Sequence, residues 1–296
     1  MTTIVPEEVG EVPAPHAGRS RNRDRIAVWA IATPLLLMAV VFLLAPWLGL
    51  PDPNRQRLSD SLLEPVWITG DWGHVLGTDK LGRDLLSRLV EGGRIVLLLA
   101  VCGTLAGLIP GVLLGMVAGY RGGWLDAVVS RFVEAWMAIP GLLFAIVILI
   151  GTGRSLAVLV GVLGLLTWPL YARVVRADAI ALKHRPFIAA LRTAGVPTWR
   201  LMVSHMLPNV ASTVLVIGAL QTGGSVLIES GLSFLGIGVV SPQISWGAML
   251  AEGRDELTKA WWVAVFPGVA ISIVVLLTNL LGDALRRRFD PRSRRY

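Results

Sequence analysis

The sequence has few charged residues. Only 16% of its 296 residues are Asp, Glu, Lys or Arg, and 54% are hydrophobic, which gives a mean hydropathy of +0.67. Soluble domains carry about 25% charged residues, so this composition excludes an ordinary soluble domain. It predicts a membrane protein.

The residues that usually carry out catalysis or hold a cofactor are also scarce. The chain has one cysteine, Cys102, and four scattered histidines, and it has no HExxH, CxxC or GxSxG motif. It contains no nucleotide-binding loop, in which GxxxxGK is followed by Ser or Thr. We therefore expect no catalytic residue, no metal site and no cofactor bound by this chain.

Ionisable residues are missing from the interiors of the apolar runs. Proton-driven carriers and pumps need such residues inside the bilayer, so a secondary carrier is disfavoured. Glu229 comes closest, at the edge of one run. We interpret it as an interfacial, hydrogen-bonded acid rather than a proton relay, because unpaired charge is rarely buried in a membrane.

Six runs without a charged residue are near or above the length of about 18–20 residues that crosses a bilayer as a helix. Lipid offers no hydrogen-bond partners to the backbone, so segments of this kind must be helical. The sequence thus predicts an all-α polytopic membrane protein. Its six transmembrane helices are expected at Ile26–Pro51, Ile95–Tyr120, Ala135–Gly153, Ser155–Ala172, Met206–Ile228 and Ala260–Gly282.

The other segments follow from these six runs. We expect a disordered cytoplasmic tail (1–25), a first transmembrane helix (26–51) and an extracytoplasmic segment (52–94). A five-helix core (95–284) and a basic cytoplasmic tail (285–296) follow. The core includes a cytoplasmic loop at 173–209.

The extracytoplasmic segment contains leucines spaced by three and four residues, beginning at Leu81, behind a possible cap at Thr78 or Asp79. This spacing predicts a short amphipathic helix. We expect it to lie on the membrane surface or to pack against the bundle before the chain turns into the bilayer at Gly92-Gly93.

Basic residues set the expected orientation. With both termini inside, 18 of the 27 Lys and Arg residues lie on the inner side, as the positive-inside rule requires. We therefore expect a multi-pass protein of the plasma (inner) membrane with both termini in the cytoplasm. The net charge of +7 reflects this topology and contact with the lipid bilayer, and it gives no reason to expect nucleic acid as a partner.

The second predicted helix carries glycines at a strict spacing of four. Such a row lets another helix approach closely, and we interpret it as a packing surface. The sequence leaves open whether the partner helix belongs to this chain or to another. The glycines are Gly103, Gly107, Gly111, Gly115 and Gly119.

The basic loop between the fourth and fifth predicted spans reads as two short helices. Pro186 can begin the first helix, Gly195 can end it in a left-handed conformation, and Pro197 or Thr198 begins the second. The loop is either a rigid protrusion that fits a cleft in another protein or an interfacial helix on lipid headgroups. Physical arguments alone favour neither.

The spacing from Ala189-Ala190 through Gly195 to Leu207-Pro208 resembles the coupling loop of binding-protein-dependent ABC importer permeases. An acid usually begins this motif, and Ala189 takes its place here. Four further stretches resemble the second permease subunit of dipeptide and oligopeptide importers: 76–95, 167–180, 229–250 and 280–292.

This resemblance implies a type I ABC importer permease fold and the role of a permease subunit in ATP-driven import of di- and oligopeptides. It implies a heterodimer with a homologous second permease, two ABC ATPase subunits or domains that hold ATP and Mg, and an extracytoplasmic peptide-binding protein. The alternative is a membrane scaffold or channel-like protein that docks a non-ATPase partner.

The resemblance also implies site residues. Contact with the ATPases is expected at Ala189, Ala190, Gly195, Val196, Pro197 and Thr198. Contact with the binding protein is expected at Trp72, Ser241, Pro242 and Trp246.

Overall fold

A computed structural model describes residues 17–289, and helices make up most of this range, which contains no β-strand. This confirms the predicted all-α class. The α-helices are α1 (Ala17–Leu43), α2 (Val66–Thr69), α3 (Leu85–Arg121), α4 (Gly123–Ala138), α5 (Gly141–Thr152), α6 (Leu156–Lys183), α7 (Pro186–Thr193), α8 (Thr198–Arg200), α9 (Leu207–Phe234), α10 (Trp246–Arg254) and α11 (Trp261–Phe289). Two 3₁₀ helices, η1 (Ala45–Trp47) and η2 (Leu58–Asp60), and a π-helical segment, η3 (Leu201–Met206), complete the set.

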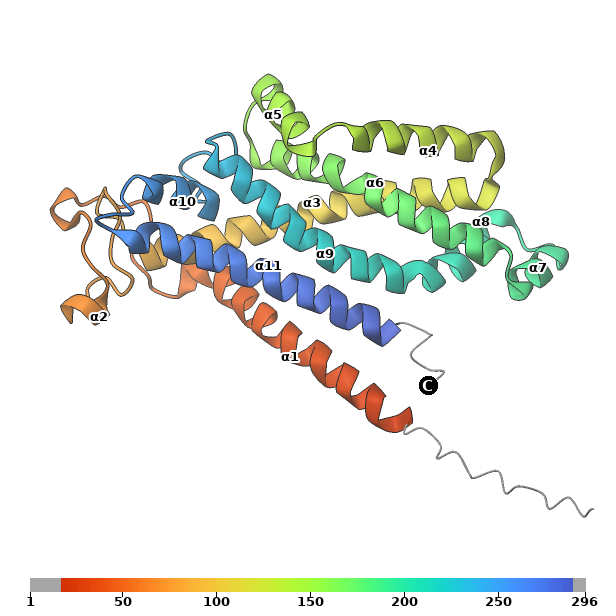
Figure 1. Cartoon of the computed structure of the whole chain (residues 1–296), viewed down its shortest axis with the longest axis horizontal. Coiled ribbons are helices and arrows are strands. Elements are labelled where there is room, and N and C mark those ends of the chain that lie inside the picture. The colour runs from red at the N-terminus through yellow and green to blue at the C-terminus, as the bar shows by residue number, and fades with distance from the viewer. Residues whose placement is uncertain (1–16, 290–296) are drawn as a thin grey trace, which may run out of the picture.

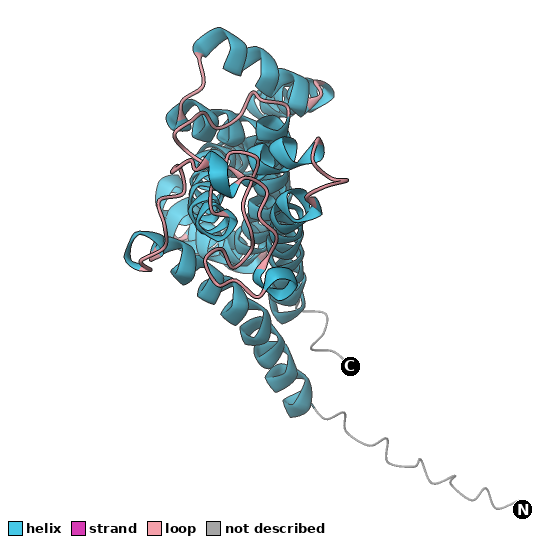
Figure 2. Cartoon of the chain, turned by 90° about the vertical axis from the view of Figure 1, so that its left-hand side faces the viewer, coloured by secondary structure: helices cyan, strands magenta, loops and turns pink. Residues whose placement is uncertain are grey.

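The long helices α3, α6, α9 and α11 run together along the long axis, with α1 beside α11 (Figure 1). The short helices α2 and α10 lie at one end of this bundle, which we call the α10 end. Helix α7 lies at the other end, the α7 end, where α1 begins and α11 finishes. Figure 2 looks along the bundle from the α10 end.

Within residues 17–289, five helices are long and apolar enough to cross a membrane, and a sixth span is obtained only if α4 and α5 are counted as one. These two helices meet at an angle of 84°, so the prediction of a single helix over Ala135–Gly153 is wrong. Pro140 explains the break, because it disfavours helical geometry in the preceding residue. Ile139 accordingly has an extended backbone, with ψ 128°.

A second proline, Pro169, creates a contact between this bent pair and α6. Pro169 lies inside α6 and has no N–H, so the carbonyl of Leu165 lacks its usual helical donor. The indole Nε1 of Trp136 on α4 donates to that carbonyl at 2.9 Å. Nearer the α7 end, Asp126 of α4 forms a two-pronged ion pair with Arg176 of α6, in which Nη2 and Oδ2 lie 2.7 Å apart.

The separate amphipathic helix predicted before the second span is absent. Asp84 caps α3 by accepting a hydrogen bond from the Ser87 backbone N–H at 2.8 Å, and the helix then runs without a turn to Arg121. Gly92 and Gly93 lie within it, against the ring of Trp246. The chain does not bend at these glycines because their bare surface is filled by that ring.

The ends of the chain also differ from the prediction. Helix α1 begins at Ala17, so residues 17–25 are helical rather than disordered, and it ends at Leu43 instead of Pro51. The ring of Pro46 clashes with a continued helix and stops it. Helix α11 continues to Phe289, and residues 1–16 and 290–296, which hold the rest of the two predicted tails, lie outside the described range.

The glycine row of α3 faces α6 of the same chain, which answers the question left open by the sequence. A Cβ built on Gly111 would lie 2.6 Å from the Trp168 carbonyl oxygen. At Gly119 it would lie 2.6 Å from the Arg176 carbonyl oxygen. Gly115 faces the carbonyl between these two, and Gly103 and Gly107 continue the row along Leu163 and Thr167. The two backbones therefore touch in a common four-residue register.

We predict that Gly111→Ala destabilises the protein by about 1–3 kcal/mol, because the added methyl meets backbone that cannot move aside. Gly161→Ala is the control, since Gly161 lies in α6 and a Cβ there meets nothing within 4 Å. Thermal unfolding of both variants in detergent measures the difference. Equal unfolding temperatures would contradict the role assigned to the glycine row.

Candidate functional site

The turn after α7 is closed by a specific set of backbone hydrogen bonds. Gly195 has φ +77°, its N–H donates to the Arg192 carbonyl at 3.1 Å, and the N–H of Val196 donates to the Leu191 carbonyl at 3.1 Å. This is the Schellman arrangement that ends a helix. A Cβ on Gly195 would meet nothing within 4 Å, so the left-handed backbone alone demands glycine here.

The turn leads directly into a transmembrane helix. Pro197 precedes α8, which begins at Thr198 as predicted, and the helical path then continues through η3 and α9 as one span, Thr198–Phe234. Pro208 lies at the start of α9. The wider π-helical turn just before it accommodates the missing N–H without interrupting the helix. The turn and α9 are thus joined by one continuous helical path.

Helix α7 is attached to the bundle through Ile188. This side chain is buried in a cluster with Val175 and Ala179 of α6 and Met206 of η3. Around it, the residues predicted for ATPase contact lie at the surface. Ala189, Ala190, Gly195, Pro197 and Thr198 are exposed, and Val196 is half-buried.

Two aromatic residues of this loop were missed by the sequence analysis. Trp199 is 62% exposed and Phe187 is 43% exposed. The guanidinium carbon of Arg200 lies 5.5 Å from the Trp199 ring centroid, and no acid occurs between Asp178 and Glu229. The loop therefore presents apolar rings among positive charges. The sequence signal that could have revealed them was the presence of aromatic residues in a basic loop without acids.

At the α10 end, the four residues predicted for binding-protein contact separate into two kinds. Trp72, Ser241 and Pro242 are exposed. Trp246 is fully buried, and its indole Nε1 donates to the Leu89 carbonyl at 2.8 Å. The prediction that Trp246 contacts a partner is thus wrong for its side chain, which packs instead against the bare backbone of α3.

A buried ionic cluster at the same end was also missed. Arg83 Nε lies 2.6 Å from Asp79 Oδ2, and its Nη2 lies 2.6 Å from Glu252 Oε2. Arg88 Nη1 also pairs with Asp79 and lies 3.0 Å from Glu252 Oε2. The two acids and two arginines balance in charge and tie the loop before α3 to α10. Asp79, weighed as a helix cap from its sequence context, is the centre of this cluster.

Glu229 lies in α9 and is fully buried within the protein. It accepts a hydrogen bond from Ser233 Oγ at 2.7 Å and has a longer contact of 3.4 Å with Ser230 Oγ. No ion pair to Glu229 occurs among the described residues. The hydrogen-bonded state predicted for this acid is confirmed, and neighbouring serines provide it.

Residues 111–295 match the family of binding-protein-dependent transport system inner membrane components. The chain belongs to this family. The match contains the loop at 173–209, for which ATPase contact is predicted, and the part of the glycine row from Gly111 onward, so both features lie in the segment that defines these permeases.

Curated relatives extend the similarity to most of the chain. The permease is 38% identical to the di/tripeptide transport system permease protein of Pseudomonas aeruginosa, over 89% of this chain and 88% of that protein. It is 37% identical to a glutathione transport system permease protein of Pectobacterium atrosepticum, over 91% and 88%. It is 33% identical to the oligopeptide transport system permease protein of Haemophilus influenzae, over 93% and 86%. The polytopic membrane fold is thereby confirmed.

For the ionic cluster, we predict that Asp79→Ala destabilises the permease by about 3–5 kcal/mol, because it leaves two arginines buried without their central partner. Asp255→Ala is the control, since Asp255 pairs with Arg254 at 3.1 Å on the exposed surface, where such pairs contribute about 0–1 kcal/mol. Thermal unfolding compares the two. A small effect at both positions would show that the cluster does not stabilise the α10 end.

Proposed function

We propose that this permease is one of two membrane subunits of an ATP-driven importer of short peptides. The relatives named above are permeases for di- and tripeptides, glutathione and oligopeptides. These substrates share a peptide backbone and free terminal charges. In this proposal a homologous second permease supplies the other half of the translocation path, and an extracytoplasmic binding protein delivers the peptide.

The unbroken helical connection from the Gly195 turn into α9 carries this proposal. Two ATPase subunits, which hold ATP and Mg, bind α7 and the turn that follows it. When the ATPases close on ATP, they displace the turn, and the continuous span Thr198–Phe234 transmits this displacement into the membrane. The contact at Ala189 is apolar, because alanine replaces the acid usual at this position of the motif.

The same proposal assigns the orientation in the plasma (inner) membrane. The α7 end faces the cytoplasm, in keeping with its basic residues, among them Arg121, Lys183, Arg192 and Arg286. Both termini lie on that side. The α10 end faces outward, where Trp72, Ser241 and Pro242 are exposed for the binding protein.

A membrane scaffold that docks a non-ATPase partner is the alternative. It requires that the chain be stable and complete without any ATPase. Purification from native membranes in mild detergent distinguishes the two. The importer proposal requires co-purification of a second permease and of ATPases with nucleotide-binding loops.

We predict that Gly195→Val abolishes coupling: peptide uptake falls at least about tenfold while ATP hydrolysis persists. Valine in a left-handed backbone costs about 1–3 kcal/mol, which opens the turn that joins α7 to α9. Uptake and ATPase rates are measured together in proteoliposomes that contain the whole transporter.

The control is Gly161→Val, which places the same side chain on an exposed face of α6, where nothing lies within 4 Å. Thermal unfolding verifies that both variants remain folded. Uptake by Gly195→Val at the level of this control would disprove the coupling role of the turn.

A further inference from the structure

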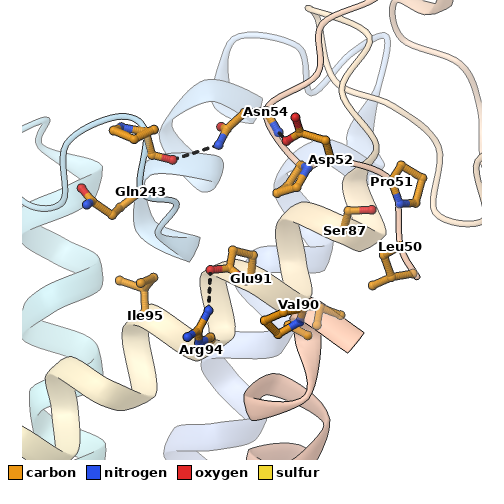
Figure 3. Close-up of a pocket in the computed structure, with 14 residues that line it drawn as sticks. Leu50, Pro51, Asp52, Asn54, Ser87, Val90, Glu91, Arg94, Ile95 and Gln243 are labelled. Carbon is orange, nitrogen blue, oxygen red and sulfur yellow. Dashed lines mark hydrogen bonds and ion pairs between the residues drawn. The ribbon is translucent and has the colours of Figure 1, made fainter. Parts of the chain in front are cut away.

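A cavity of about 400 Å³ lies at the α10 end (Figure 3). Three segments that are far apart in the sequence line it: residues 45–54 after α1, the first turns of α3, and residues 242–243 before α10. Asn54 Nδ2 donates to the Pro242 carbonyl at 3.1 Å and joins two of them. The volume falls within the range of roughly 300–1,000 Å³ found for small-molecule sites.

Three charged residues line this cavity, and one of them, Asp52, already accepts a hydrogen bond from the Asn54 backbone N–H at 2.9 Å. Glu91 and Arg94 project from successive turns of α3, with Arg94 Nη1 3.4 Å from Glu91 Oε1 (Figure 3). Their side chains are 28% and 40% exposed. The contact is longer than the pairs of 2.6 Å in the neighbouring ionic cluster, so each group keeps capacity to bind a ligand.

The remaining lining suits a small molecule with both polar and apolar parts. Val90 and Ile95 supply apolar surface from α3, and Asp52, Asn54 and Gln243 supply polar groups from the loops. Figure 3 shows Asn54 and Gln243 across the cavity from Glu91 and Arg94.

We propose that this cavity receives the incoming peptide by its two terminal charges, with Arg94 binding the carboxylate and Glu91 the ammonium group. A zwitterion replaces the ion pair without leaving either charge unpaired, whereas a simple anion or cation would strand one of them. Arginine is also well suited to a planar carboxylate. The assignment rests on the proposed peptide-importing function.

An exposed apolar face of α3 begins beside the cavity. From Arg94, the residues Leu98, Val101 and Leu105 follow on the same face of α3, and all three are exposed. This face leads from the cavity toward the α7 end. In the proposed transporter it borders the path shared with the second permease, so the cavity is the entrance to that path.

The chain contains a matched control pair. Arg131 and Glu134 on α4 have the same residue types, the same three-residue spacing and the same distance of 3.4 Å between Nη1 and a carboxylate oxygen. Their side chains are 86% and 61% exposed, and neither lines this cavity.

The test uses the whole transporter in proteoliposomes, with labelled Ala-Phe supplied on saturated binding protein. Glu91→Gln and Arg94→Gln should each lower uptake about tenfold or more, the loss expected when one charged hydrogen bond is removed. Glu134→Gln and Arg131→Gln should leave uptake unchanged.

Terminally blocked peptides identify which residue reads which end. Each is supplied on the same saturated binding protein, so that differences between permease variants arise in the permease. Wild-type permease should transport N-acetylated and C-amidated Ala-Phe poorly. Glu91→Gln should no longer distinguish the free from the acetylated peptide, and Arg94→Gln should no longer distinguish the free from the amidated one. Unchanged discrimination in both variants would overturn the proposal.

A charge exchange separates recognition from a structural role. Glu91→Arg combined with Arg94→Glu keeps the ion pair but exchanges the positions of the two charges relative to the loops that line the cavity. If the pair only stabilised α3, the double variant would regain wild-type uptake, and the cavity proposal would be wrong. Recognition of the termini requires that uptake remain low.

Failure of the broader proposal has a different signature. A wild-type transporter that takes up no peptide at all would refute the peptide-importing function. Normal wild-type uptake, with the cavity variants equal to the control pair, would refute only the role of Glu91 and Arg94.

Discussion

Close contact between the backbones of α3 and α6 determines where the other functional elements lie. Helices in lipid associate through packing more than through exclusion of water, so a row of five glycines provides an unusually close fit. Helix α6 then holds α4 through the carbonyl freed by Pro169 and through Arg176. It also holds α7 through the cluster around Ile188. The bent pair and the coupling loop therefore both depend on the placement of one helix.

In the proposed function, the two ends of the permease perform different tasks, and long helices join them. On the proposed orientation, α7 and its turn meet the ATPases, and α9 continues from that turn through the membrane. The α10 end is fastened by four alternating charges and contains the cavity beside α3. In that proposal, the α10 end holds the peptide entrance, and the α7 end connects the ATPases to a continuous helix.

Features that depend on one segment were predictable from the sequence. The apolar runs gave the helical class, the spacing of the glycines gave a packing surface, and Gly195 and Pro186 marked the ends of α7. Each of these follows from local rules on backbone conformation or on hydrocarbon thickness.

Features that depend on distant partners were not predictable. Asp79 and Asp84 are both acceptable caps, and only Arg83, Arg88 and Glu252 decide which acid takes that role. Pro140 and Pro169 look alike in the sequence. The first breaks a helix, while the second stays within one because Trp136, 33 positions earlier in the sequence, satisfies the freed carbonyl. Burial of Trp246 likewise depends on two glycines of α3.

The π-helical segment Leu201–Met206 has a consequence for how this subunit tolerates changes in length. Each residue of a helix turns the chain by about 100°, so the extra residue held in the π-helical turn sets the angle between the coupling turn and the packing face of α9. A deletion of one residue between Thr198 and Leu207 would keep every side chain of α9 in place but swing Trp199 to another side of the helix axis. The number of residues between Gly195 and Pro208 therefore affects the structure of this permease independently of which residues they are.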